Sequence, residues 1–265
     1  MKRFLSYDPK LLIYGFLIVF FASYGQTFFI SLFNSEIRAF YNLSDGEFGL
    51  VYAVSTLLSS FIFISFAKLI DYIDLRFYSF IVSFGLLLAC IGMVILLNNI
   101  IFLFFVIFML RFFGQGAMTH AGETTMARYF GKDRGKALSV ATLGGMTGVM
   151  FLPYVSINLF KNLEMSQLWI YASFSIIFFI PFIFLALSDQ KIRHGKFDKT
   201  LLDDPLNIKL RTRDIIKHKK FYIYLPLSIA APFISTGLMF HQIYIFDQKG
   251  WSLEMLGNGY ILLGF

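Results

Sequence analysis

Six long stretches without a charged residue constrain this chain more than any other feature. No Asp, Glu, Lys or Arg occurs in residues 11–33, 48–67, 77–110, 137–160, 165–188 and 221–246. A helix needs about 20 apolar residues to cross the hydrocarbon core of a bilayer, and most of these stretches are that long. Only 15% of the chain is charged, whereas about 25% of a typical soluble domain is. The sequence therefore predicts an all-α membrane protein.

The number of crossings follows from the lengths of these stretches. The 77–110 stretch is too long for one crossing, and Asn98-Asn99 interrupts it, so we expect two helices there, the second continuing to about Ala127. This makes seven crossings, with an eighth that begins near Glu254. Its roughly 12 residues reach about 18 Å at 1.5 Å each, short of the ~30 Å core. We therefore expect the chain to be part of a longer protein.

Positive charge alternates from loop to loop. Of the 23 Lys and Arg residues, nineteen fall before the first stretch, near 68–76, near 128–136 or in the loop 191–220, and three fall in the other loops. Basic loops face the cytoplasm, so we expect a cytoplasmic N-terminus in a bacterial-type inner membrane. Because the net charge of +7 lies in loops beside apolar helices, it predicts contact with the lipid bilayer and no nucleic-acid partner.

The chain divides into three parts. We expect a six-helix transmembrane bundle over 1–188, a basic cytoplasmic linker over 189–220 and the start of a second bundle over 221–265. In the linker, residues 211–222 (RTRDIIKHKKFY) fit either an amphipathic surface helix or a solvated segment. The first bundle and the start of the second show a weak internal repeat. Ser44, Gly49 and Tyr52 recur 208 residues later as Ser252, Gly257 and Tyr260. Parallel repeats of this kind occur in membrane transporters.

Arg111 is the sharpest polar feature. It lies about ten residues into the fourth expected helix, where an arginine costs about 2.5–3.5 kcal/mol to insert. Gln115, Met118, Gly122 and Thr125 would share its face if the helix has the α period. Either Arg111 lines a central path and attracts an anion or biases a proton-carrying group, or it pairs with carbonyls or a polar side chain at a helix contact.

Other polar groups in the spans carry weaker signals. Gln26 would hydrogen-bond a substrate or another helix. His241 and Gln242 would contact substrate or reach interfacial water, and Glu123 fits a side chain that extends to the interface. The glycines of the fifth helix, among them Gly144 and Gly148, favour close helix packing, with a hinge as the alternative.

Signatures of enzymes are missing from the sequence. No HExxH pair, GxSxG turn or P-loop is present, and the four histidines lack metal-ligand spacing. We expect no metal, no cofactor and no enzymatic activity. A membrane-embedded enzyme or receptor is the remote alternative.

Several motifs resemble the major facilitator superfamily. Residues 67–76 (AKLIDYIDLR) are similar to its GxxxDRxGRR loop: Asp71 and Arg76 match, and Ala67, Tyr72 and Asp74 depart. The fourth helix is similar to bacterial members with an Arg-x-x-Gly-Gln-Gly stretch and an Arg-Gly-Lys-Ala loop, here residues 111–116 and 134–137. Residues 23–33 (SYGQTFFISLF) and 237–254 (GLMFHQIYIFDQKGWSLE) also resemble such members.

The resemblance implies two six-helix bundles around a central site, with alternating access. It implies a secondary transporter, monomeric when complete, that carries a small organic solute. Arg111 favours a proton-coupled organic anion, as in monocarboxylate-type porters, and drug or metabolite efflux is the alternative. Expected substrate-binding residues are Gln26, Arg111, Gln115, His241 and Gln242, and expected gating residues are Asp71, Arg76 and Arg134.

Overall fold

The described part of the chain is built from helices. The computed structural model describes residues 4, 7–160, 162–190 and 212–263, and no strand occurs among them. The longer elements are α2 (Pro9–Ala22), α3 (Thr27–Ile30), α4 (Asn34–Tyr41), α5 (Asp45–Phe66), α6 (Leu75–Ile95), α7 (Ile100–Met109), the π-helical η4 (Leu110–Met118), α8 (Thr119–Tyr129), α9 (Arg134–Leu159), α10 (Met165–Leu187), α12 (Thr212–Lys217), α13 (Lys219–Phe240), α14 (Gln242–Gln248) and α15 (Leu253–Leu263). Short 3-10 turns join some of them: η1 (Ser23–Gly25), η2 (Ser31–Phe33), η3 (Ala67–Asp71) and η5 (Gly131–Asp133).

The number of membrane crossings agrees with the sequence. Among the described residues, six helices are long and apolar enough to span a bilayer, and a seventh is counted if the bent pair Pro9–Gly25 and Thr27–Tyr41 is one span. The predicted turn at Asn98-Asn99 is confirmed, because α6 ends at Ile95 and Asn99 caps α7. A capping box of Ser44 and Glu47 starts α5. The chain is a multi-pass membrane protein.

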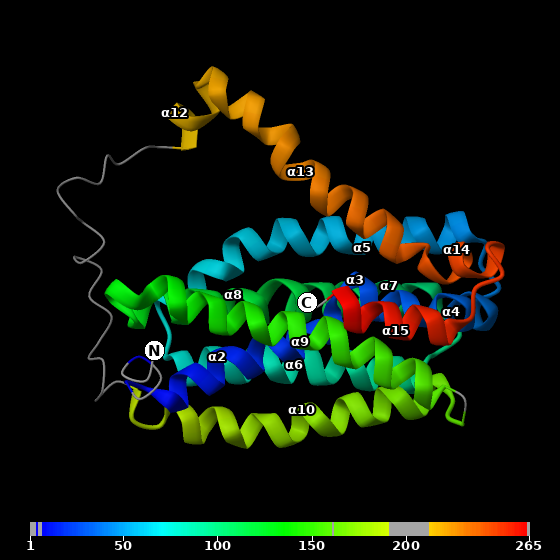
Figure 1. The fold of residues 1–265 in the computed structure, drawn as a ribbon, viewed down its shortest axis with the longest axis horizontal. Helices are drawn as coiled ribbons and strands as arrows, with labels where there is room; N and C mark the ends of the chain where they lie inside the picture. The colour runs from blue at the N-terminus through cyan, green and yellow to red at the C-terminus, as the bar shows by residue number, and fades with distance from the viewer. Residues whose placement is uncertain (1–3, 5–6, 161, 191–211, 264–265) are drawn as a thin grey trace.

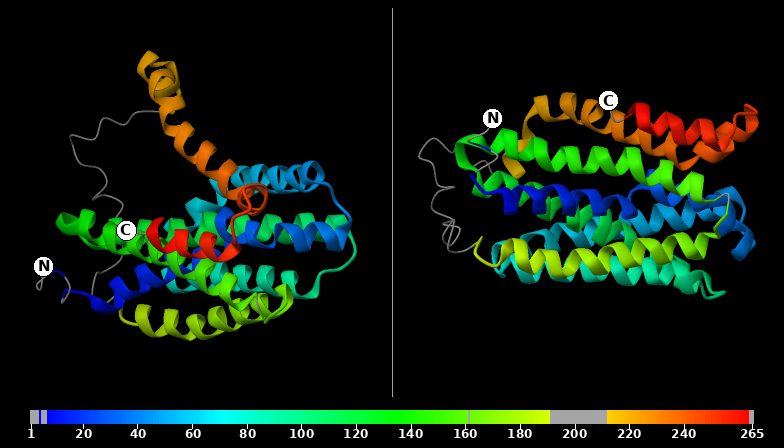
Figure 2. Two further views of the ribbon diagram at one scale, coloured as in Figure 1. Left: turned by 45° about the vertical axis from the view of Figure 1, so that its right-hand side comes forward. Right: turned by 60° about the horizontal axis from the view of Figure 1, so that its bottom comes forward.

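The spans run back and forth along one long axis (Figures 1 and 2). We call the end that holds residues 67–74 and 130–134 the basic end, and the end that holds α4 and α14 the opposite end. α2 packs between α9, α8 and α10, while α10 also packs on α6. α13 diverges from the bundle at the basic end and meets α3 at the opposite end, and α15 lies along α9.

Glycines let α9 approach α2 closely, as the packing interpretation predicted. A Cβ atom on Gly144 would lie 2.0 Å from the carbonyl oxygen of Phe16, and one on Gly148 would lie 2.1 Å from the Oγ of Ser23. Small residues at such crossings bring two backbones into van der Waals contact. The same contact places the end of α2, next to Gly25, firmly inside the bundle.

Two of the expected spans, over 11–33 and 221–246, are interrupted helices. The first bends by 47° at Gln26, which has the extended angles φ −84° and ψ 153°. The second breaks at His241, between α13 and α14. Of the two alternatives for residues 211–222, the described part is helical: α12 ends at Lys217, and α13 begins at Lys219. The rest of the linker prediction, residues 191–211, lies outside the described residues.

Candidate functional site

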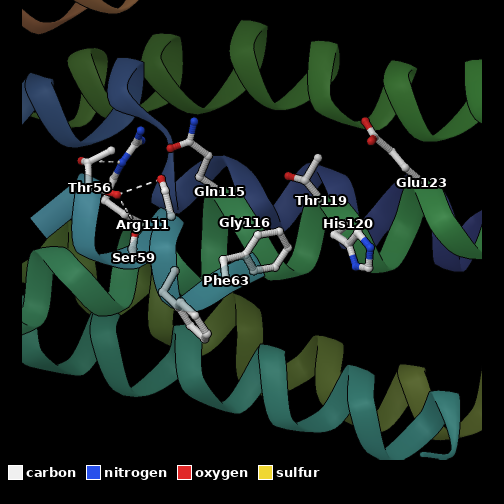
Figure 3. Close-up of a pocket in the computed structure, with 11 residues that line it drawn as sticks. Thr56, Ser59, Phe63, Arg111, Gln115, Gly116, Thr119, His120 and Glu123 are labelled. Carbon is white, nitrogen blue, oxygen red and sulfur yellow. Dashed lines mark hydrogen bonds between the residues drawn. The ribbon is translucent and has the colours of Figure 1, made fainter. Parts of the chain in front are cut away.

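A polar cavity of about 390 Å³ lies between α5 and the fourth span. Its wall combines hydroxyls from α5 with an arginine, an amide, an imidazole and a carboxylate from the facing helix, and two phenyl rings complete the lining (Figure 3). The lining residues are Thr56, Ser59, Ser60, Phe63, Arg111, Phe112, Gln115, Gly116, Thr119, His120 and Glu123.

Arg111 is the deepest charged group of this cavity and is only 3% exposed. Its Nε donates to the Thr56 hydroxyl at 3.2 Å, and its Nη1 donates to the Gly25 carbonyl at 3.0 Å. Its guanidinium carbon also lies 5.2 Å from the centre of the Tyr52 ring, a cation–π contact. Arg111 forms no ion pair with any described residue. Its partners are therefore neutral, and part of its five N–H donors faces the cavity.

The bend in the first span explains why the Gly25 carbonyl is available. In a continuous α-helix the N–H of Phe29 would donate to Gly25, but here it donates to Gln26 at 3.2 Å. The backbones also touch at this point: a Cβ atom on Gly114 would lie 2.6 Å from the Cα of Gly25. Irregular backbone inside a membrane protein needs partners of this kind.

The face of the fourth helix differs from the predicted one. Met118, Gly122 and Thr125 do not line the cavity with Arg111 and Gln115, because all three are buried in the bundle. The prediction assumed an α period throughout. The segment Leu110–Met118 is π-helical, with wider turns that rotate all later residues.

Thr119, His120 and Glu123 take the place of the predicted residues. With Arg111 and Gln115, the residues Thr119 and Glu123 recur every four positions, and Figure 3 shows this row along one side of the helix. The His120 ring meets Phe63 edge-on at 5.5 Å. A search for polar residues at a constant spacing of four would have found this row. The prediction used the α-helical spacings of 4, 7, 11 and 14 residues from Arg111, which select other residues.

The other predicted binding residues lie away from this cavity. Gln26 sits at the bend of the first span and does not line it. His241 lines a separate pocket of about 360 Å³ with Asp45, Gly49 and Tyr52. Gln242 is 6% exposed, and its Nε2 donates to the Phe28 carbonyl at 3.0 Å and the Ser31 hydroxyl at 2.8 Å. The structure thus joins Arg111 with Gln115 and leaves the other three elsewhere.

The predicted gating residues all lie at the basic end. Asp71, at the end of η3, forms an ion pair with Arg128 of α8. Arg76 pairs with Asp74 at 3.3 Å, within its own turn. Arg134 is exposed at the first residue of α9 and has no ion pair with a described residue. The first of these contacts ties two spans together, and the second is local.

No cluster of three or more His, Cys, Asp or Glu side chains that could hold a metal ion occurs in the described ranges. The cavity wall offers one cation, several hydroxyls and an amide for recognition, with Glu123 and His120 as groups that can bind a proton.

Comparison with known proteins places the chain in a family. No curated protein and no solved structure matches it. The family model of the Major Facilitator Superfamily matches residues 15–265, which is nearly the whole sequence. The described residues form six long apolar helices and a bent first span, and the chain belongs to the Major Facilitator Superfamily and is a membrane transporter.

Proposed function

We propose that the protein carries a small organic anion across the membrane by alternating access and couples this movement to a proton. Arg111 carries the proposal, because it is a buried cation at the wall of a polar cavity whose described partners are all neutral. Charged groups inside a membrane are costly, and they mark substrate or ion pathways. A carboxylate accepts two parallel hydrogen bonds from a guanidinium, so an anionic ligand fits the donors that remain.

The proposed proton site is Glu123. It is the one carboxylate in the cavity wall, and it forms no ion pair with any described residue. It lies at the end of the row that begins at Arg111, twelve residues away. A carboxylate that borders the path and lacks a fixed cation can take up and release a proton as the path opens and closes.

Alternating access requires two bodies that move against each other. We propose that residues 1–188 form the first body, that residues 221–265 belong to the second, and that residues 189–220 link them. The gating residues Asp71, Arg76 and Arg134 would act at the basic end, where the ion pair of Asp71 with Arg128 joins η3 to α8.

A second candidate is efflux of an aromatic drug or metabolite. Phe63 and Phe112 in the cavity wall support it, because phenyl rings favour flat apolar ligands. The two functions differ in the ligand charge and in the need for Arg111.

Ligand binding by the purified protein in lipid nanodiscs separates them. Acetate, lactate and gluconate are each added in increasing concentration, and so is the uncharged amide of each. Binding is measured by the change in tryptophan fluorescence and in the melting temperature of the protein. We expect a carboxylate to bind and its amide not to, and we expect Arg111→Ala to weaken binding about ten- to hundredfold, since a hydrogen bond to a charged group contributes about 1.5–3 kcal/mol. Arg111→Lys should restore part of the affinity, because lysine keeps the charge but not the fork.

Lys136→Ala is the matched control, because it removes a cation that pairs with Asp133 at 2.6 Å outside the cavity. Its affinity should equal that of the wild type. The anion proposal is rejected, and efflux is supported, if the acids and their amides bind with equal affinity. The same holds if the Arg111→Ala protein binds a neutral aromatic compound as tightly as the wild type does.

A further inference from the structure

The opposite end of the molecule is closed by a cluster of hydrogen bonds between the first span and the residues after 235. The Ser31 hydroxyl donates to the Met239 carbonyl at 2.7 Å, and the Asn34 amide donates to the Phe240 carbonyl at 3.4 Å. The Gln242 amide donates back to Phe28 and Ser31. We call these contacts the closure, with the residues Phe28, Ser31, Asn34, Met239, Phe240 and Gln242.

The break at His241 makes the closure possible. Because α13 ends at Phe240, the last carbonyls of that helix are not all used within it and can accept from the first span. Phe240 also turns its ring into the bundle, where it stacks on Phe48 at 5.6 Å and lies 4.9 Å from the Tyr52 ring.

Tyr52 touches both the closure and the cavity arginine. It is 5% exposed, its ring contacts Phe240 on one hand and the Arg111 guanidinium at 5.2 Å on the other, and its hydroxyl donates to Thr27 at 2.8 Å. Thr27 is the first residue after the bend at Gln26, in the half-span that carries Ser31 and Asn34. Phe48, one turn earlier on α5, stacks on Phe240, and its ring centre lies 6.5 Å from that of Tyr52. The cation–π contact of Arg111 is with Tyr52.

We propose that Tyr52 is the positioning residue through which an anion at Arg111 loosens the closure. The proposal rests on the anion site proposed above. An anion bound to the remaining donors of Arg111 pulls the guanidinium away from its two neutral partners and from the face of the Tyr52 ring. A shift of Arg111 releases the Tyr52 ring, and with it the packing of Phe240 and the tether to Thr27.

Hydrogen exchange of the backbone tests this, because it reports local opening of each segment. With lactate or gluconate as the probe, exchange in segments 27–41 and 237–248 should become faster in the wild-type protein. In Tyr52→Leu the probe should still bind, but the exchange of both segments should no longer respond to it. Tyr52→Phe keeps the ring and loses only the bond to Thr27, so it should retain a response in 237–248.

Phe48→Leu is the matched control. This substitution weakens the packing of Phe240 and leaves the Tyr52–Arg111 contact in place. Without the probe, exchange in segments 27–41 and 237–248 should therefore be faster than in the wild type, and the probe should still increase it. A retained response in Tyr52→Leu, or an equal loss in Phe48→Leu, would overturn the role of Tyr52. Exchange in α10 (Met165–Leu187) shows whether each variant is folded.

A second arm needs no ligand. Arg111→Ala removes the contact directly, so it should speed exchange in 237–248 when Tyr52 is present and add nothing when residue 52 is leucine. Additive effects of the two substitutions would contradict the coupling. If no carboxylate binds, the anion proposal fails, and this arm still decides whether Tyr52 links Arg111 to the closure.

Discussion

Two residues of the fourth span have different proposed roles in the cavity: Arg111 is a fixed cation that binds the anion, and Glu123 is a carboxylate that binds the proton. Arg111 is held by Thr56 and Gly25, whereas Glu123 has no ion pair with a described residue. Glu123→Gln mimics the protonated acid permanently, so the variant can no longer load and release a proton. In proteoliposomes we expect it to lose lactate accumulation driven by a pH gradient and to keep lactate exchange. Glu47→Gln, an exposed carboxylate in the cap of α5, should behave like the wild type; accumulation by Glu123→Gln would exclude Glu123 as the proton site.

The sequence identified some of these residues and missed others for one physical reason. Arg111 and Gln115 stand out because polar side chains inside a span are costly. Glu123 was interpreted as a side chain that extends to the interface; it is exposed and also lines the cavity. His120 carried no signal, because the helix was assumed to keep the α period past Leu110. The π-helical turns depend on backbone contacts such as that of Gly114 with Gly25, which no local pattern encodes.

Helices in this bundle are positioned by close backbone contacts, of which the α2–α9 pair is the clearest. A side chain at Gly144 meets the carbonyl of Phe16, which is backbone and cannot rotate away. We expect Gly144→Val to lower the free energy of unfolding by about 1–3 kcal/mol or more, as overpacking does. Gly135→Ala in the same helix is the control, because no atom lies within 4 Å of the added Cβ and alanine favours a helix by about 1 kcal/mol over glycine. Thermal unfolding in detergent measures both, and equal melting temperatures would contradict the packing argument.

Helix ends were easier to predict than helix breaks. Ser44 with Glu47 and Asn98 with Asn99 are local signals, and both mark the ends that the structure shows. The bend at Gln26 and the break at His241 lie inside long uncharged stretches that carry no helix-end signal. Their carbonyls are satisfied by Arg111 and Ser31 from other spans, so only the tertiary structure reveals the breaks.

At the scale of the whole molecule, the two ends of the bundle differ in charge and in how the helices contact each other. The ion pairs of Asp71 with Arg128 and of Asp133 with Lys136 gather at the basic end, and the closure lies at the opposite end. Only Arg38 and Lys249 are basic among the described residues at the opposite end, where Arg38 pairs with Asp45 at 2.6 Å. Because basic loops stay in the cytoplasm, we propose that the basic end and the N-terminus are cytoplasmic in a bacterial-type inner membrane.

Labelling of single cysteines in intact cells tests this orientation. Ala39 is exposed in α4 and Lys132 is exposed in η5, so a cysteine at either position can react with a membrane-impermeant maleimide. The background is Cys90→Ser, although Cys90 itself is buried. We expect Ala39→Cys to be labelled in intact cells and Lys132→Cys only after the membrane is permeabilised, because a 19-to-3 charge bias fixes the orientation during insertion. Labelling of Lys132→Cys but not Ala39→Cys in intact cells would invert the topology, and the closure would then face the cytoplasm.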